Sequence, residues 1–165
     1  MMFSTKAEYG IRVMVELARQ RGDEPIPLAE IAERGGLPLA YLEHLVARLR
    51  KADLVTSRRG SRGGYLLARP AGEITMAEVV EALEGSIAPI ECISEAADGS
   101  IVCAREADLD HVCPTKLLWT RVRFSIVSTL RETTLADLTK SAGAQPSPTG
   151  PTLPSIPYRS LTTGA

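Results

Sequence analysis

Two short amphipathic segments joined by a glycine turn place the strongest constraint on the fold of this chain. They lie within residues 28–55, which read LAEIAERGGLPLAYLEHLVARLRKADLV. The spacing predicts a helix over 28–34, a turn at 35–37 and a second helix from 38, because proline suits the first helical turn. The apolar face of the second helix consists of Leu39, Leu42, Leu45, Val46 and Leu49. This layout is typical of a helix-turn-helix, although any small helical bundle also fits it.

A β-hairpin is predicted directly after the second helix. Two short strand-like runs, 54–58 and 64–68, flank a tip of glycine and arginine at 59–63. Residues 48–69 hold seven basic side chains and one acid, although the whole chain has a net charge of −1. Such a basic patch can neutralise DNA phosphates, and a narrow arginine tip can enter a minor groove. The hairpin is therefore interpreted as a wing, with a solvated turn as the alternative.

Four more helices are predicted outside this unit. The first covers about 5–20, where Thr5 and Glu8 have the spacing of a capping box, and another begins at Thr75, which has the same spacing to Glu78. A long helix is expected over 114–131 and a short one over 134–140. The long helix carries an apolar stripe, for which a second copy of the chain is the expected partner. Its members are Leu118, Trp119, Val122, Ile126 and Leu130.

All three cysteines of the chain lie in one polar, loop-like stretch, residues 91–119. Cys92, Cys103 and Cys113 are separated by ten and nine residues, and His111 comes two residues before the last. Thiols in a reducing compartment are more often metal ligands or reactive groups than disulfide partners. Soft sulfur donors at this wide spacing favour an iron–sulfur cluster, while a zinc site, a thiol redox switch and incidental cysteines remain alternatives.

Composition favours a soluble, cytoplasmic protein. The 165 residues are 44% hydrophobic, which is enough for a modest core, and no apolar run is long enough to span a membrane. Charges at helical spacing near the N-terminus do not resemble a secretory signal. No nucleophile–base constellation or phosphate-binding glycine loop is recognisable, so an enzyme is not expected.

Several stretches resemble one family of regulators. They are STKAEYGIRVMVELA, the run from PIPLAEIAERGG to GGYLLARP, ITMAEVVEALEG, CPTKLLW and TTLADL, in order over residues 2 to about 139. In these stretches the chain resembles the iron–sulfur cluster regulators of the IscR type, within the Rrf-two superfamily of winged-helix regulators. The fold expected is mainly α with a small β-hairpin, comprising a winged helix-turn-helix DNA-binding domain and a long dimerisation helix.

The chain is expected to divide into four parts. Residues 1–85 would form the DNA-binding domain with its following helix, 86–113 a cluster-binding loop, 114–140 the dimerisation helix and a short last helix, and 141–165 a disordered proline-rich tail. The resemblance implies a homodimer on a palindromic double-stranded DNA operator, with the second helix in the major groove and the wing in the minor groove. The residues expected at the DNA are Leu39, Ala40, Tyr41, Glu43, His44, Arg48, Arg50, Arg58, Arg59 and Arg62.

The resemblance also assigns the cysteines. Cys92, Cys103 and Cys113 match, in order, the three cluster ligands of the family. Their spacing is wider than is usual there, so both a [2Fe–2S] and a [4Fe–4S] cluster stay open. The function implied is a transcription regulator, expected to be a repressor, that senses iron–sulfur status or oxidative or nitrosative stress. A cluster-free thiol-switch regulator and a metabolite-responsive regulator with incidental cysteines are the alternatives.

The fourth ligand departs from the family pattern. Where the best-known member has a histidine three residues after the last cysteine, this chain has Lys116, which cannot bind iron while protonated. Glu8 of the other subunit is the favoured ligand, because related sensors have a carboxylate at the matching position. The competing explanation is that Glu8 only completes a capping box with Thr5, and His111 is the less favoured ligand.

Overall fold

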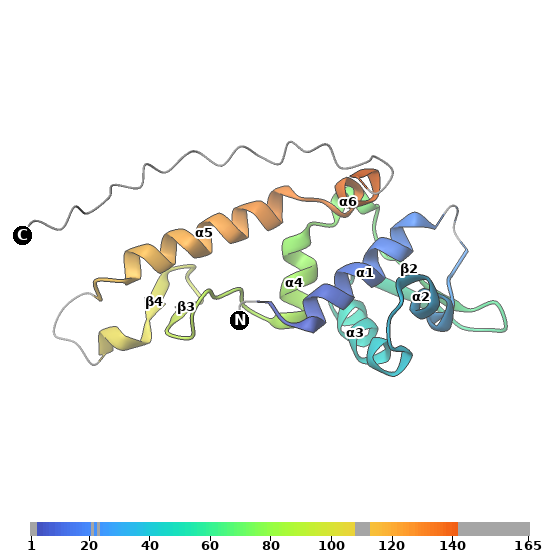
Figure 1. The fold of residues 1–165 in the computed structure, drawn as a ribbon, viewed down its shortest axis with the longest axis horizontal. Helices are drawn as coiled ribbons and strands as arrows, with labels where there is room; N and C mark the ends of the chain where they lie inside the picture. The colour runs from blue at the N-terminus through green and yellow to red at the C-terminus, as the bar shows by residue number, and fades with distance from the viewer. Residues whose placement is uncertain (1–2, 21, 23, 108–112, 142–165) are drawn as a thin grey trace, which may run out of the picture.

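The computed structural model describes residues 3–20, 22, 24–107 and 113–141. Figure 1 shows a winged-helix unit from which one long helix extends past a second, smaller hairpin. The predicted fold class, mainly helical with small antiparallel hairpins, is confirmed. Among the described residues, no helix is both long and apolar enough to cross a membrane. The predicted tail over 141–165 lies outside the described residues apart from its first residue.

The predicted helix-turn-helix is present and consists of α2 (Leu28–Gly35) and α3 (Leu39–Lys51), which both pack on α1 (Thr5–Arg19). Gly36 ends α2 with a left-handed φ of 62°, a conformation that glycine adopts without a steric penalty. The buried face of α3 consists of Leu42, Leu45, Val46 and Leu49. Leu39, predicted on the same face, is exposed instead, because it lies at the first position of the helix, at the margin of the core.

The predicted wing is an antiparallel hairpin of β1 (Val55–Arg58) and β2 (Gly64–Leu67). Its base is tied to the segment before α2, where Ile26 and Tyr65 exchange backbone hydrogen bonds of 3.0 and 2.9 Å. This contact explains Gly64, because a Cβ there would lie 2.3 Å from the carbonyl oxygen of Ile26. The wing is therefore anchored to the helix-turn-helix by a close approach of two backbones.

Only one of the two predicted capping boxes forms. At the start of α4 (Met76–Glu84), the hydroxyl of Thr75 accepts from the N–H of Glu78, and the Glu78 carboxylate accepts from the N–H of Thr75. The capping box predicted at Thr5 is wrong, because Ser4 is the N-cap of α1 and has the extended backbone that a cap requires. Thr5 is already the first helical residue.

α4 crosses α1 at very short range. A Cβ on Gly10 of α1 would lie 2.0 Å from a methyl carbon of Leu83, so the crossing depends on glycine. One residue further along α4, Glu84 accepts hydrogen bonds of 3.0 and 3.3 Å from the backbone N–H groups of Ser4 and Ala7. The carboxylate thereby binds amide groups at the N-terminus of α1, where a helix has few internal hydrogen-bond partners to offer.

The cysteine-bearing stretch contains a second hairpin that the sequence did not predict. β3 (Ile93–Glu95) pairs antiparallel with β4 (Ile101–Cys103), and the 3-10 turn η2 (Ala104–Ala107) follows. The N–H of Ala104 donates a 2.8 Å hydrogen bond to the carbonyl of Cys92. Strands of three residues are too short for an alternating pattern to be recognised, so the stretch resembled a loop.

The last two helices leave the winged-helix unit and return to it. α5 (Lys116–Glu132) extends away from the unit, and α6 (Leu135–Ser141) lies back beside it (Figure 1). α6 packs on α1 and on the 3-10 turn η1 (Ala71–Glu73), and its first residue, Leu135, is fully buried. α5 is therefore attached to the unit at its C-terminal end.

The apolar stripe predicted on α5 serves mainly the chain's own packing. Val127 is buried, and Ile126 and Leu130 pack beside it against α1 and α4. The apolar side chains left exposed on α5 are Leu117, Leu118 and Phe124. Of these, only Leu118 belonged to the predicted stripe. The prediction considered the helix alone and did not include its packing against the rest of the chain.

Replacing Gly64 with alanine tests the anchoring of the wing. The new Cβ would collide with backbone atoms that cannot rotate away, so we expect the free energy of unfolding to fall by about 1–3 kcal/mol, the usual cost of an overpacked site. Denaturant unfolding followed by circular dichroism measures this. Gly72→Ala is the matched control, since a Cβ there meets nothing within 4 Å. Equal stability of the two variants would contradict the anchoring.

Candidate nucleic-acid interface and thiol core

The outward face of α3 presents small and polar side chains beside an aromatic pair. Its exposed members from the predicted set are Leu39, Ala40, Glu43 and His44. Tyr41 is half-buried and meets Tyr9 of α1 edge-on, with ring centroids 5.8 Å apart and planes at 86°. This edge-to-face contact orients the start of α3 against α1. The side chains predicted to read bases thus lie together at one exposed end of the helix.

The basic residues at the other end of α3 differ in their contacts. Arg50 is exposed. Arg48 donates a hydrogen bond of 3.0 Å from its guanidinium to the carbonyl oxygen of Leu83, in the last turn of α4. With Lys51, Arg48 also lines an open recess of about 580 Å³ beside α4. Arg48 therefore joins two helices, a contact that the sequence did not indicate.

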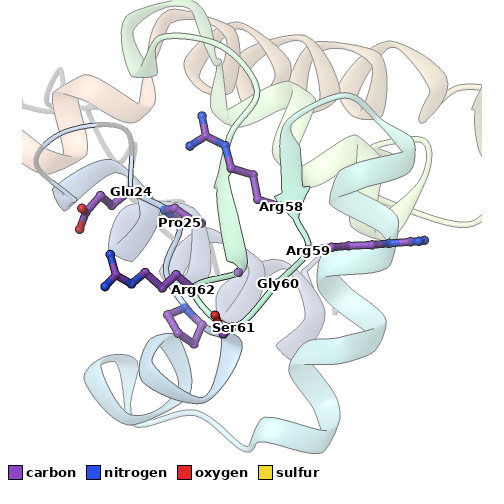
Figure 2. Close-up of a pocket in the computed structure, with 9 residues that line it drawn as sticks. Glu24, Pro25, Arg58, Arg59, Gly60, Ser61 and Arg62 are labelled. Atoms are coloured by element: carbon purple, nitrogen blue, oxygen red, sulfur yellow. The ribbon is translucent and has the colours of Figure 1, made fainter.

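Three arginines surround the tip of the wing (Figure 2). Arg58, Arg59 and Arg62 line an open recess of about 790 Å³ together with Glu24 and Pro25 from the segment before α2. Figure 2 shows Arg59 extending to the side on which α3 lies, whereas Arg58 and Arg62 point to the side of Glu24 and Pro25. Positive charge therefore flanks the tip on two sides, an arrangement that suits contacts with phosphates on both edges of a groove.

All three cysteines meet in a small core at the N-terminal end of α5. Cys103, at the end of β4, and Cys113, just before α5, are 2% and 6% exposed, and Cys92 packs against them as a half-buried side chain. The other members of this thiol core are Ile93, Ile101 and Trp119. The three sulfurs are free thiols. The prediction of cysteines on a flexible loop is corrected here, because a hairpin and a helix start enclose them.

The thiols differ in acidity. Hydrogen bonds from the hydroxyl and the backbone of Thr115 lower the pKa of the Cys113 thiol, because they stabilise the thiolate. The Thr115 hydroxyl oxygen lies 3.4 Å from the Cys113 sulfur. Burial raises the pKa of the Cys103 thiol, and the neighbouring thiols of Cys113 and Cys92 raise it further. The sulfur atoms therefore influence one another, and Cys113 is favoured over Cys103 as a thiolate.

A carboxylate and an ammonium group hold the backbone at Cys113. Glu106 of η2 accepts a hydrogen bond of 3.3 Å from the Cys113 N–H, and its other oxygen pairs with Nζ of Lys116 at 2.7 Å. The hydrogen bond from the Lys116 ammonium lowers the pKa of Glu106. Lys116 is thus engaged in an ion pair with Glu106.

The donor chemistry of the thiol core fits an iron–sulfur cluster. Irons in such clusters prefer soft sulfur ligands, and three thiols converge here with one of them favoured as thiolate. Within the part of the chain that the structure describes, no three His, Cys, Asp or Glu side chains are arranged to hold a metal ion. The core therefore offers three neighbouring sulfur donors that are not arranged as a metal site in this structure.

The two candidates for a fourth ligand differ in position. The Glu8 side chain is 57% exposed on α1 and pairs with Arg12, one turn later, at 2.8 Å. It does not cap the helix, so the competing explanation for this residue is wrong. Among the described residues, Glu8 forms no metal-binding group with the cysteines of its own chain. His111 lies outside the described residues.

Sequence reasoning missed Arg123, a residue that connects several elements. Its side chain on α5 donates a 3.0 Å hydrogen bond to the carbonyl oxygen of Ile87 and forms an ion pair with Glu95 of β3. Glu84 and Glu106 were missed in the same way. Their partners lie between 7 and 80 residues away in the chain, beyond the reach of a capping-box or helical-pair pattern.

Comparisons with known proteins agree with this architecture. The family model Rrf2, described as iron-dependent transcriptional regulators, matches residues 3–141. The solved structure of CymR, the global cysteine regulator of Bacillus subtilis, is 37% identical with a TM-score of 0.69 and covers 86% of this chain and 98% of its own. The structure of T. potens IscR is 39% identical with a TM-score of 0.68, covering 86% and 88%. The transcriptional regulator IscR of Xenorhabdus nematophila is 38% identical over 141 residues, 86% of this chain and 80% of its own.

Arg59→Ala tests the wing as part of a nucleic-acid interface. If Arg59 contacts a phosphate, its loss weakens binding to duplex DNA and lowers the slope of log affinity against log salt by about 1. Fluorescence anisotropy over a range of salt concentrations measures both the affinity and its salt slope. The duplex is one that the wild-type protein selects from a random-sequence library. Arg131→Ala, an equal charge loss on the exposed last turn of α5, is the control. A slope unchanged in Arg59→Ala would exclude the contact.

Proposed function

The chain belongs to the Rrf2 family of transcriptional regulators, and from that premise we propose that it binds DNA as a homodimer under the control of an iron–sulfur cluster. The observation that carries the proposal is the convergence of Cys92, Cys103 and Cys113 in the thiol core. In this proposal residues 1–85 bind DNA, 86–113 carry the cluster ligands and 114–140 pair the subunits.

The DNA is bound by the exposed end of α3 and by the wing. The start of a recognition helix is the part that reaches base edges in the major groove, and the side chains there are exposed on α3. The arginines at the tip of the wing contact phosphates and enter the adjacent minor groove. A two-fold dimer presents both elements twice, so the operator is a palindrome.

The second copy packs on the outer face of α5. Leu117 and Phe124, two helical turns apart, are exposed there, with Phe124 73% accessible, and Leu118 lies beside them. Apolar side chains of this size gain free energy when a partner covers them. An open, mainly apolar recess of about 440 Å³, lined in part by Cys113 and Leu117, adjoins this face. A dimer formed here brings residues of the partner to the thiol core.

The thiolates of Cys92, Cys103 and Cys113 would hold the cluster, as either [2Fe–2S] or [4Fe–4S]. When bound, the cluster supplies a centre that oxygen, nitric oxide or a change in iron supply can alter. The chain's own groups prepare the site: Thr115 favours the thiolate of Cys113, and Glu106 holds the Cys113 backbone. The side chain of Trp119 and the hairpin cover the sulfurs and limit access of water.

Glu8 of the partner subunit is the proposed fourth ligand. Its carboxylate is exposed on α1 and has no capping role that a ligand role would disturb. An oxygen donor is harder than a thiolate, so the iron that it binds exchanges ligands more readily than the others. Because Glu8 lies on the helix that packs against α3, this ligand would also connect the cluster to the DNA-binding unit of the other chain.

A cluster-free thiol switch is the second candidate function. It is favoured by the proximity of the buried Cys103 and Cys113 as free thiols of different acidity. It is also in keeping with the similarity to CymR, which is described as a cysteine regulator. In this case oxidation of neighbouring thiols, rather than loss of a cluster, would change DNA binding.

Anaerobic purification of the full chain tests the proposed function. We expect a coloured protein with iron and sulfide in equal amounts, cluster bands in visible absorption and a Mössbauer spectrum that assigns the cluster type. The triple variant Cys92→Ala, Cys103→Ala, Cys113→Ala is the control and should be colourless. A colourless wild-type protein that cannot be reconstituted with iron and sulfide would exclude the cluster. DNA binding that then follows formation of a disulfide would establish the thiol switch.

Glu8→Ala tests the fourth ligand. Loss of a ligand exposes one iron, so we expect a changed visible spectrum. We also expect iron to be released to a chelator about tenfold faster, which is the lower end of the usual effect of losing a contact at a metal site. Arg12→Ala is the matched control, because it breaks the same ion pair but leaves the carboxylate in place. If Glu8→Ala and Arg12→Ala behave alike, the carboxylate is not a ligand.

A further inference from the structure

Two arginines from different helices hold the end of α4 and the segment that follows it. Arg48 of α3 donates to the carbonyl oxygen of Leu83, and Arg123 of α5 donates to that of Ile87, both at 3.0 Å. The side chains of Leu83 and Ile87 are themselves buried. The backbone of residues 83–87 is therefore fixed from one side by the recognition helix and from the other by α5.

Arg123 has a second contact that reaches the thiol core. Its guanidinium pairs with the carboxylate of Glu95 on β3. The hairpin that ends in Cys103 begins with Ile93, two residues before Glu95, and Ile93 pairs directly with Cys103. The Arg123 side chain is only 12% exposed, so water screens this ion pair weakly on the arginine side.

These contacts form one short connection between the two sites. It starts at the cysteine hairpin, passes through Glu95 and Arg123 to the segment 83–87, and reaches α3 through Arg48. Its three side-chain contacts are hydrogen bonds or ion pairs of charged groups, the strongest kind of polar contact in a protein, and the backbone of residues 83–87 joins them. If both contacts of Arg123 persist, a displacement of the hairpin therefore also affects the carbonyl group of Ile87.

We propose that Arg123 is a positioning residue that couples the state of the thiol core to the orientation of α3, so that the DNA affinity depends on the cluster through this side chain. The inference rests on the proposed function and names the route of its regulation. A residue with a purely structural role stabilises the loaded and the cluster-free protein equally, and shifts no equilibrium between them. Substitution of a coupling residue, in contrast, changes the ratio of the DNA affinities of the cluster-loaded and the cluster-free protein.

The experiment compares that ratio among variants of the full chain. Dissociation constants are measured anaerobically for cluster-loaded and cluster-stripped protein on a duplex selected from a random-sequence library. For the wild type we expect a ratio between about 5 and 150, the usual range of allosteric coupling. We expect Arg123→Gln to bring the ratio close to one, while its iron content and visible spectrum stay those of the wild type.

Three further variants secure the interpretation. Glu95→Gln removes the ion pair between the hairpin and Arg123 but leaves the hydrogen bond from Arg123 to Ile87, so it should also lower the ratio of the two DNA affinities. Because the Glu95 carboxylate is half-exposed, this variant decides the question if Arg123→Gln does not fold. Arg123→Lys keeps the cation but cannot hold both partners, and should give an intermediate ratio. Arg131→Gln, the same charge change on the exposed last turn of α5, should keep the wild-type ratio.

The two possible failures are distinguishable. A wild-type ratio above five that persists in Arg123→Gln, or in Glu95→Gln if the former does not fold, would overturn the coupling role and leave the proposed function intact. A wild-type protein that holds a cluster but has a ratio of one, or that holds no cluster, would overturn the proposed function and this inference together.

Discussion

The close crossing of α1 and α4 at Gly10 is the constraint on which the rest of the structure depends. The absence of a side chain at Gly10 lets Leu83 fill the space against α1. The same approach brings Glu84 to the N-terminus of α1, where it binds two amide groups, and places the Leu83 carbonyl within reach of Arg48 on α3. One helix crossing thus sets the relation between α1, α3 and the segment that leads to the cysteines.

The thiol core depends on this arrangement because it has little structure of its own. Its hairpin has strands of three residues, and an isolated two-stranded hairpin of that size is not stable in water. It is held by α5 through Arg123 and by Glu106 at Cys113. α5 is in turn fixed to the winged-helix unit by Val127 and by the return of α6. The cysteine site and the DNA-binding unit are therefore parts of one packed body.

The sequence predicted the elements whose signals are local. The glycine turn before Leu39, the capping box at Thr75 and the arginine tip of the wing each follow from neighbouring residues, and all three were found where expected. What it could not predict were contacts between distant residues, such as Arg48 with Leu83, or the burial of cysteines that lie in a polar stretch. The cap predicted at Thr5 failed because Ser4 is the N-cap, and the carboxylate at this helix start comes from Glu84, far along the chain.

The coupling proposed for Arg123 requires that the thiol core and α3 respond together. Hydrogen–deuterium exchange of the wild-type protein, with and without a bound cluster under anaerobic conditions, is the decisive test, because amide exchange reports local opening element by element. We expect changed protection in α3 and in residues 83–87 as well as around the cysteines. Changes confined to the cysteine hairpin and the start of α5, with α3 exchanging identically in both states, would contradict it.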